Sequence, residues 1–252
     1  MELKNYVSEE YIKNDVIHLP DRVNKIKIDV GLSINAPVSW EWLENDPGVV
    51  VFGFEPNLKN IKAIKGETIN DSPDILRQFT TNNIRKYLGD RFFIIPYALS
   101  QENGKKEFYN VSNKLNQSKS GYEFESGSSS LLKPITMEYV KSKVKVYNLF
   151  TFLSKFDWKK ITSITQIKID AQGEDFKIIY GLKNFIKKIE LISYEINAPG
   201  YQGYNNYKLQ NIKLFFYMVT NGFYPFKKTA SEITYKNIRY IKSKDNYYTS
   251  GH

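Results

Sequence analysis

Runs of apolar residues, separated by segments of helical length, predict an alternation of strands and helices along the chain. Runs that are apolar on both faces are typical of strands in a sheet covered by helices on each side. Such strands are predicted within residues 23–30, 48–56 and 90–100, and helices over residues 39–45 and 73–87, the latter after the helix-start signal Ser72-Pro73. The order predicted is β-α-β-α-β.

A second strand-helix-strand unit is predicted further along the chain. Residues 166–170 and 191–196 are strand-like, and an acidic turn follows the first of them. Between them, apolar residues at helical spacing predict a helix over 174–185; these are Phe176, Ile179, Leu182 and Phe185. The two units together predict one doubly wound α/β domain spanning residues 1–252, with a mostly parallel sheet and helices on both faces.

The remaining segments are less regular. Residues 105–111 alternate after the turn QENGK, which predicts a strand in a hairpin with the strand before it. Residues 112–130 are rich in Ser, Asn and Gly and have no period, so we expect a long loop that acts as a lid and orders on ligand binding. The tail contains strand-like pieces near Phe223 and at 239–241.

The first 22 residues are interpreted as a leader without a targeting signal. They contain no apolar segment of the kind found in signal peptides, and their acidic residues argue against a transit peptide. No apolar run is long enough to predict a membrane span. The expected location is therefore the cytoplasm.

Composition removes several kinds of chemistry. The chain has no cysteine, which excludes disulfides, thiolate nucleophiles and the commonest zinc sites. Its two histidines are His18, in the leader, and His252, the final residue, so a Ser-His-Asp triad would be hard to assemble. Acid-base chemistry must then use carboxylates, tyrosines or lysines.

The net charge of +9 is compatible with an anionic partner such as nucleic acid. The lysines, however, are spread along the sequence rather than gathered in one block. A diffuse positive excess gives solubility as readily as it gives a binding face. Nucleic acid is thus the less favoured partner.

Two residues at the ends of predicted strands indicate a nucleoside site. Ligands of doubly wound sheets bind beyond the carboxyl ends of the strands. Gly31 would let a ligand approach the backbone, and Glu55 follows 24 positions later, near the spacing at which an acid binds both hydroxyls of a ribose. This pair alone does not choose between NAD and S-adenosylmethionine.

The turn after Gly31 favours a cofactor without phosphates. A dinucleotide turn needs further glycines so that a pyrophosphate can lie against backbone N–H groups. Here the turn holds the β-branched Ile34 and also Pro37, which leave little room and one N–H fewer. S-adenosylmethionine has no phosphate and is the cofactor predicted.

Five segments in order resemble the FkbM-type methyltransferases: IKIDVG, VVVFGFEPNLKNI, IIPYALSQENGKKEFY, GSSSLLKP and IKIDAQGEDFKIIYGL followed by IELISYEIN. The resemblance covers about residues 26–197. It implies a class I, Rossmann-like, S-adenosylmethionine-dependent enzyme that methylates hydroxyls of sugars, glycans or secondary metabolites.

The resemblance also implies roles for individual residues. Asp29 and Gly31 would shape the methionine end of the cofactor site, Glu55 would hold the ribose, and the stretch 97–100 would lie along the adenine. The candidate cofactor-binding residues are Asp29, Gly31, Ser33, Glu55, Pro56, Ala98, Leu99 and Ser100. Residues 170–174 would face the methyl group and the acceptor.

Two departures from the family pattern affect these roles. Where the family usually has D-V-G-A-N-x-G, this chain has Leu32, Ser33 and Asn35, which bears on the pose of the cofactor's carboxylate. Where the family usually has D-V-E-G, Gln172 replaces the glutamate and so removes one candidate base.

Three carboxylates are the catalytic candidates. Asp170 ends a predicted strand at the ligand edge and could act as the base or orient the acceptor, although an acid there could equally cap the following helix. Glu174 carries the same two readings, and Glu195 lies in an apolar run where an unpaired charge would be costly. Grouped acids could bind Mg²⁺, but the spacing does not require a metal.

Tyr201 and Tyr204 follow the strand that contains Glu195 and could stack on an acceptor, or serve as loop anchors. The function predicted is O-methylation of a small-molecule or carbohydrate acceptor. Two alternatives stay open: an RNA methyltransferase, and a Rossmann-like binding protein whose altered turn has lost the cofactor.

Overall fold

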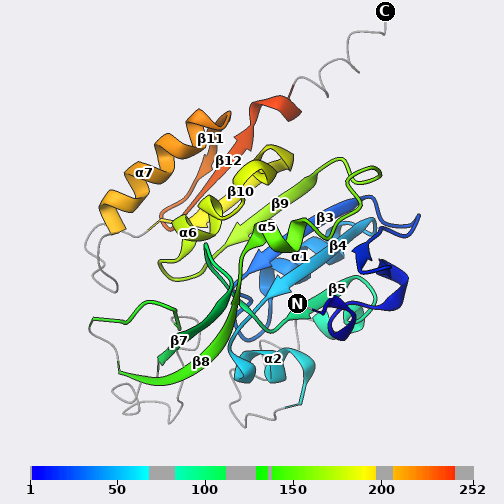
Figure 1. Cartoon of the computed structure of the whole chain (residues 1–252), viewed down its shortest axis with the longest axis horizontal. Helices are drawn as coiled ribbons and strands as arrows, with labels where there is room; N and C mark the ends of the chain where they lie inside the picture. Colours follow the sequence, from blue (N-terminus) through cyan, green and yellow to red (C-terminus); the bar gives the residue numbers. More distant parts are fainter. Residues whose placement is uncertain (1, 68–82, 112–128, 136–137, 197–206, 242–252) are drawn as a thin grey trace, which may run out of the picture.

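The computed structural model describes residues 2–67, 83–111, 129–135, 138–196 and 207–241. Within this part of the chain, a seven-stranded sheet forms the centre of the molecule (Figure 1). From one edge to the other its strands are β11 (Phe223–Lys228), β12 (Glu232–Asn237), β10 (Ile189–Glu195), β9 (Ile164–Ile169), β3 (Lys25–Val30), β4 (Val49–Phe54) and β5 (Phe92–Ile95). All neighbours are parallel except β10 with β12 and β12 with β11.

The strand order reverses between β3 and β9. The chain runs from β3 to β4 and β5 on one side, then returns to place β9 and β10 on the other. At this point the N–H of Asp170 donates to the carbonyl of Val30 at 2.9 Å, and the N–H of Gly31 donates to the carbonyl of Phe54 at 3.0 Å. The carboxyl ends of three strands therefore meet where ligands of doubly wound folds bind.

Helices cover both faces of the sheet, as the sequence predicts. On one face, α1 (Pro37–Asn45) and α2 (Leu58–Lys65) pack against β4 and β5, and Val49 and Val51 point into this cluster. On the other, α5 (Leu149–Leu153), α6 (Asp175–Tyr180) and α7 (Tyr207–Thr220) contribute to the main core, into which Phe52 points. Alternate residues of β4 thus serve two separate cores, so the strand is apolar throughout.

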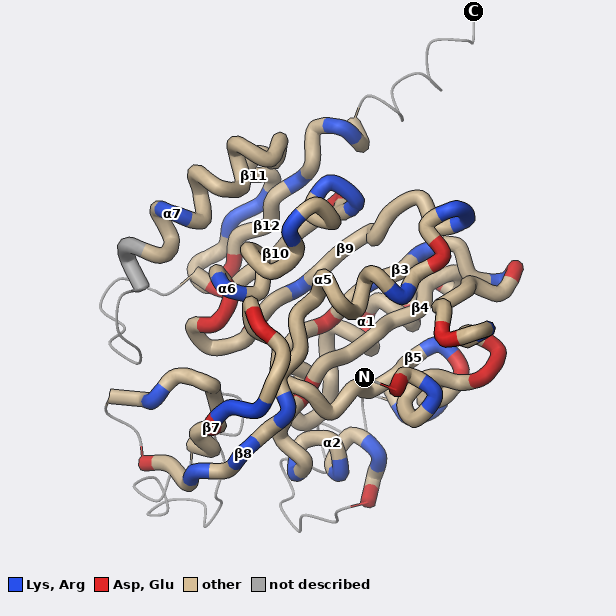
Figure 2. The backbone as a smooth tube through the Cα atoms, in the orientation of Figure 1, with Lys and Arg blue, Asp and Glu red and all other residues tan. Residues whose placement is uncertain are grey.

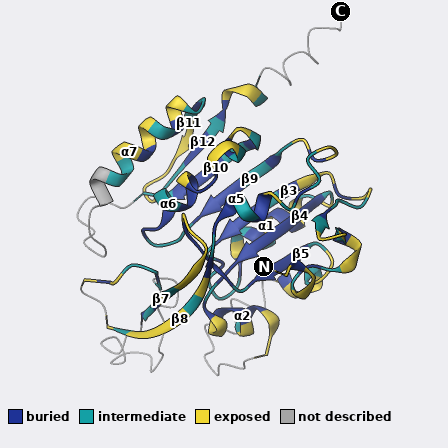
Figure 3. Ribbon diagram, viewed as in Figure 1, coloured by how far each residue is buried: buried dark blue, intermediate teal, exposed yellow. Residues whose placement is uncertain are grey.

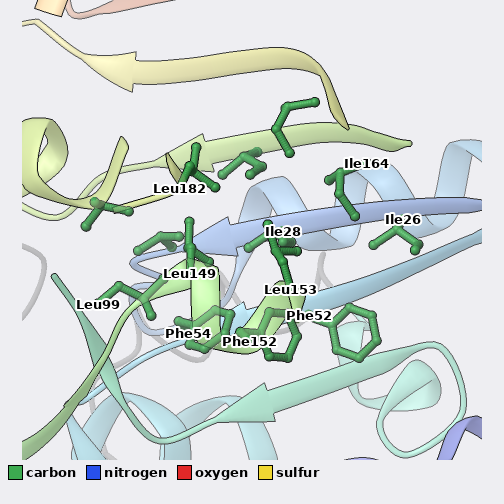
Figure 4. Packing of buried hydrophobic residues seen from close by; sticks show 14 of the residues in the cluster. Ile26, Ile28, Phe52, Phe54, Leu99, Leu149, Phe152, Leu153, Ile164 and Leu182 are labelled. Carbon is green, nitrogen blue, oxygen red and sulfur yellow. The ribbon is translucent and has the colours of Figure 1, made fainter. Parts of the chain in front are cut away.

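The main core joins segments that lie far apart in the sequence. Figure 4 shows Ile28 and Phe52 of the sheet beside Phe152 and Leu153 of α5. The N-terminal residues pack onto the same core through short elements: η1 (Leu3–Asn5), η2 (Glu9–Tyr11), β1 (Ile12–Lys13) and β2 (Val16–Ile17). Tyr11 is fully buried, with its ring 4.9 Å from that of Phe93.

A second, three-stranded sheet projects from the domain and corrects one prediction. It consists of β6 (Ala98–Leu99), β8 (Tyr139–Tyr147) and β7 (Gly104–Val111), with β8 in the middle. The strand predicted at 105–111 exists, but it pairs antiparallel with β8 rather than with the strand before it. The turn QENGK therefore leads the chain across β8 instead of closing a hairpin. Figure 3 shows that much of this sheet is exposed.

Two further expectations about helices and strands are wrong. The helix predicted over 174–185 stops at Tyr180, and a 3-10 helix, η6 (Lys183–Lys188), follows because Lys183 adopts a left-handed φ of 49°. Phe185 then packs against Trp158, with ring centroids 5.2 Å apart. Residues 239–241, predicted as strand, lie mainly in η7 (Ile238–Tyr240), which the Asn237 side chain caps by accepting from the N–H of Arg239.

Some predicted segments lie outside the described residues. They are residues 73–82 of the predicted helix 73–87, residues 112–128 of the predicted lid, and both candidate tyrosines, Tyr201 and Tyr204. The end of the predicted helix, η3 (Ile84–Tyr87), is a 3-10 helix. The described part of the chain contains no helix that is long and apolar enough to cross a membrane.

Because β3 and β9 approach closely at Gly31, we expect a side chain at this position to destabilise the fold. A Cβ at Gly31 would lie 2.1 Å from the carbonyl oxygen of Asp170, and the residue has a φ of +81°. Gly222 has a similar φ of +85° but nothing within 4 Å of its Cβ position. We expect Gly222→Ala to lower the free energy of unfolding by about 1–2 kcal/mol, and Gly31→Ala by at least about 3 kcal/mol. Urea denaturation of both variants measures the difference, and equal losses would contradict the packing described.

Candidate active site

A cavity opens at the carboxyl ends of β3, β4 and β9. It collects most of the candidate cofactor-binding residues, and those on its wall are Gly31, Ser33, Glu55, Pro56, Ala98 and Leu99. Two others lie behind the wall: Asp29 is buried beneath the turn, and Ser100 bonds to the wall residue Glu174. The cavity thus brings together candidate residues from segments that are distant along the chain.

The turn after β3 has an unusual backbone course. Gly31, Ser33 and Ala36 all adopt left-handed φ values, of 81°, 56° and 44°. Pro37 then begins α1, where the absence of its N–H costs nothing. The N–H of Leu32 points inward and donates to Glu55 Oε2 at 3.2 Å. This N–H is therefore used by the protein itself.

Glu55 is the central acid of the cavity. Its Oε1 accepts from the N–H of Asn57 at 2.8 Å, while its Oε2 accepts from Leu32. Burial raises the pKa of Glu55 to about 7, although the hydrogen bond from Asn57 acts to lower it. The side chain of Asn60 and the N–H of Ser33 also bond to this carboxylate, so protein donors surround both of its oxygens.

Asn60 is a site residue that sequence reasoning missed. It lies on α2 and is 2% exposed, and its side chain lines the same cavity. Its Oδ1 has no hydrogen-bond partner among the described residues. A buried acceptor of this kind is costly without a ligand. The only signal in the sequence is a polar residue at a position where α2 faces the core.

The arrangement fits the adenosyl part of S-adenosylmethionine. Glu55 offers two acceptor oxygens on the cavity wall, Asn60 offers an unpartnered acceptor, and Gly31 brings bare backbone to the edge. The turn presents no row of free N–H groups for a pyrophosphate, since Leu32 already bonds to Glu55.

Asp170 also lies on the cavity wall and is held from two sides. Its Oδ2 accepts from Lys168 Nζ at 3.2 Å, and its Oδ1 accepts from Gln172 Nε2 at 2.8 Å. Gln172 has a left-handed φ of 49°, as does Gly173 with 100°, so a tight turn aims this amide. The Asp170 carboxylate is therefore fixed in orientation at the cavity.

Glu174 is fully engaged by other side chains. Its Oε2 accepts from Ser100 Oγ at 2.7 Å and its Oε1 from Lys177 Nζ at 2.6 Å. Lys106 adds a bond to Ser100 Oγ at 3.2 Å. Glu174 makes no side-chain cap at the start of α6, so the capping reading is not what the geometry shows. It ties the end of β6 to the wall of the cavity.

Glu195 lies outside the cavity wall but is joined to it. Its Oε2 accepts from Gln172 Nε2 at 2.9 Å, and the same nitrogen bonds to Asp170. Burial raises the pKa of Glu195 to about 7, and the charge of Asp170 adds to the rise while Lys168 opposes it. A carboxylate in apolar surroundings needs a hydrogen-bond partner, and for Glu195 this partner is the amide of Gln172.

Lys168 is the second residue that sequence reasoning missed. Its ammonium lies 3.7 Å from Asp29 Oδ1, 3.2 Å from Asp170 Oδ2 and 3.2 Å from the carbonyl of Gly31. Asp29 is completed by Ser39, whose Oγ donates to Oδ2 at 2.6 Å. The available signal is a lysine between two isoleucines of a predicted strand, because an unpaired buried ammonium is costly.

Several carboxylates gather near this end of the sheet. Within the described residues, however, no group of three or more Asp, Glu, His or Cys side chains is arranged to hold a metal ion.

The strand order and the cavity at its reversal define an α/β protein with a nucleoside-cofactor site of the Rossmann-like kind. The sequence matches the family described as "Methyltransferase FkbM domain" over residues 29–223, which is most of the chain. The protein belongs to this family and is an S-adenosylmethionine-dependent methyltransferase.

Solved structures with a similar fold are distant in sequence. One, of TrmK from M. capricolum with S-adenosyl-homocysteine, has 12% identity and a TM-score of 0.39, covering 87% of this chain and 69% of its own. A precorrin-6y C5,15-methyltransferase from Geobacter metallireducens has 10% identity and a TM-score of 0.40, covering 94% and 97%. A human methyltransferase 10 domain containing protein has 10% identity and 0.38, covering 88% and 73%. No curated protein matches the sequence.

Asp175, next to the site, yields a prediction about stability. Burial raises the pKa of Asp175 to about 7, and its Oδ1 has no partner among the described residues. Because the folded pKa exceeds the unfolded one, this group removes stability as the pH rises from about 4 to about 7. We expect Asp175→Asn to gain stability relative to the wild type over this range, by up to about 1.4 kcal/mol per unit of pKa elevation.

The measurement is urea denaturation at about pH 5 and about pH 8. Asp21→Asn, at an exposed position, is the matched control and should give a constant difference from the wild type. A difference for Asp175→Asn that is the same at both pH values would contradict the burial of an ionisable Asp175.

Proposed function

We propose that the protein transfers the methyl group of S-adenosylmethionine to a hydroxyl of a sugar, a glycan or a secondary metabolite. The observation that carries this proposal is the Asp170 carboxylate, which lies on the cavity wall between Lys168 and Gln172. A fixed carboxylate at this place can orient a hydroxyl and accept its proton.

Bound S-adenosylmethionine supplies a methyl group on a cationic sulfur, which is electrophilic without a metal. Glu55 would bind the ribose hydroxyls of this cofactor, and the stretch from Ala98 to Ser100 would lie along its adenine. Gly31 and Ser33 would border the methionine end, above the buried Asp29. The cavity contacts of Glu55 and Gly31 support these assignments.

On the acceptor side, Asp170 is the proposed base. The acceptor hydroxyl would donate to this carboxylate, so that its oxygen gains electron density as the new C–O bond forms and the proton passes to Asp170. Glu174, already bonded to Ser100 and Lys177, shapes the wall instead. Glu195 acts through Gln172 by fixing the direction of the Asp170 carboxylate. Tyr201 and Tyr204 remain the proposed contacts to the acceptor.

The role of Glu55 predicts a pH dependence of cofactor binding. The ionised carboxylate accepts from two hydroxyls, and its pKa is about 7. Affinity for S-adenosylhomocysteine should therefore fall as the pH drops below 7, by up to about tenfold per pH unit. Glu55→Gln should weaken binding by about ten- to a hundredfold and remove this pH dependence.

Calorimetric titration at several pH values, with NAD as a control ligand, measures both effects. The matched control is Glu44→Gln, because the Glu44 carboxylate pairs with Lys86 away from the cavity. This variant should bind the cofactor product as the wild type does. If Glu55→Gln bound the cofactor product normally, the ribose would be held elsewhere.

The role of Asp170 predicts a loss of rate without a loss of cofactor affinity. In a screen of hydroxyl acceptors with S-adenosylmethionine, Asp170→Asn should lower kcat by about 10²–10⁴-fold. Its affinity for S-adenosylhomocysteine should stay within about threefold, because the carboxylate faces the acceptor side. Asp90→Asn, at an exposed acid, serves as the control. Undiminished turnover by Asp170→Asn would reject Asp170 as the base.

One observation favours an RNA acceptor as the second candidate. Lys141, Lys143 and Lys145 alternate along β8 and so share one face of the projecting sheet, where Lys105 pairs with Lys145. Figure 2 shows basic segments, in blue, along β8 and on α2. Such a row could contact phosphates. RNA binding that weakens steeply with salt, and again in Lys143→Ala, would support this candidate.

A further inference from the structure

Lys168 is a buried cation in the middle of the central sheet. Its side chain is 11% exposed, and its neighbours along β9, Ile167 and Ile169, are buried in the main core. Transfer of an ammonium into such a place is costly unless strong acceptors surround it. The reaction outlined above uses Asp170 directly but assigns no task to this lysine.

The ammonium of Lys168 connects two parts of the site. It donates to the backbone carbonyl of Gly31 at 3.2 Å and to Asp170 Oδ2 at 3.2 Å, and it lies 3.7 Å from Asp29 Oδ1. The first two contacts are hydrogen bonds, whereas the contact to Asp29 is an ion pair beyond hydrogen-bond distance. Gly31 belongs to the turn on the cofactor side, whereas Asp170 lies on the acceptor side.

We propose that Lys168 is a positioning residue that holds the Gly31 turn and the Asp170 carboxylate in a fixed relation through a single nitrogen. This inference rests on the proposed function, in which Asp170 receives the acceptor's proton. In-line transfer depends on the distance and angle between the two reacting groups, so a link that sets both sides at once acts on the geometry of the transfer.

Acids on neighbouring strands act on the charge of Lys168. The charges of Asp29 on β3, Glu195 on β10, Glu232 on β12 and Asp170 at the end of β9 interact with that of Lys168, and Asp175 on α6 interacts with Asp170 and Glu195. Burial acts to lower the pKa of Lys168, but the charges of Asp29 and Asp170 outweigh it, and the pKa is raised. In the described part of the chain, Asp29 and Asp170 have no other basic side chain within 4 Å.

A purely structural ion pair would stabilise the fold without acting on the cofactor side. Lys168→Met keeps the approximate shape of the side chain and removes the charge, which separates the two explanations. Lys27→Met is the matched control. Lys27 is a half-buried lysine of the neighbouring strand β3, but its ammonium lies over the ring of Trp42, 4.7 Å from the centroid, rather than among the acids.

Two readouts need no acceptor. The first is calorimetric affinity for S-adenosylhomocysteine, which should fall about tenfold or more in Lys168→Met because the anchor of the Gly31 carbonyl is lost. The second is the titration of Glu195, followed by carbon-13 NMR of labelled glutamate and assigned with Glu195→Gln. Since Lys168 acts to lower the pKa of Glu195, that pKa should rise above its value of about 7 in Lys168→Met.

Lys27→Met should leave both readouts at their wild-type values. Lys168→Arg keeps the charge but replaces a compact ammonium with a planar fork. It should restore the titration of Glu195 and only part of the affinity. If Lys168→Met is too unstable to titrate, Lys168→Met combined with Asp29→Asn removes the unpaired buried acid, and its affinity and titration are then compared with those of Asp29→Asn alone.

The proposal is overturned if Lys168→Met binds S-adenosylhomocysteine as tightly as the wild type, whatever its stability. It is also overturned if affinity falls but the titration of Glu195 is unchanged, since the lysine would then act on one side of the site alone. A failed screen for hydroxyl acceptors would count against the proposed function and would leave both of these readouts intact.

Discussion

The contact between the turn after β3 and the end of β9 is the constraint on which the site depends. At Gly31 there is no room for a side chain, because a Cβ would lie 2.1 Å from the carbonyl oxygen of Asp170. The turn after β3 and Asp170 are thus parts of one backbone junction, tied by the bond from the Asp170 N–H to Val30. Any movement of one strand end displaces the other, so the site inherits the rigidity of the central sheet.

The buried carboxylates at this junction share a small number of hydrogen-bond and ion-pair donors. Lys168 serves Asp29 and Asp170, and the amide of Gln172 serves Asp170 and Glu195. Burial nevertheless raises the pKa values of Glu55, Asp175 and Glu195 to about 7. Buried carboxyl groups with pKa values raised in this way lower the stability of the fold as the pH rises. Such raised pKa values are typical of functional sites.

The sequence predicts the parts of the fold that depend on local pattern. The buried strands β3, β4 and β9, and the places of Gly31, Glu55 and Asp170 at their ends, follow from apolar runs that stop at a polar residue. What it misses depends on partners far away in the chain. The strand at 105–111 alternates correctly, but only β8 decides where it pairs. The helix over 174–185 ends early, and Phe185 in the 3-10 helix that follows packs on the distant Trp158. Asn60 and Lys168 join the site only when distant segments meet.

Gln172 shows why a departure from the family pattern need not mean a lost function. Where the family usually has glutamate, this chain has an amide whose Nε2 donates to Asp170 at 2.8 Å and to Glu195 at 2.9 Å. A glutamate here would bring a third carboxylate to two that already repel, and it could donate to neither when ionised. The substitution removes one candidate base and holds another in place, because the amide that replaces the acid donates to Asp170, a residue of the cavity wall. In this chain the Gln172 amide therefore provides the donor that the two neighbouring carboxylates, Asp170 and Glu195, share.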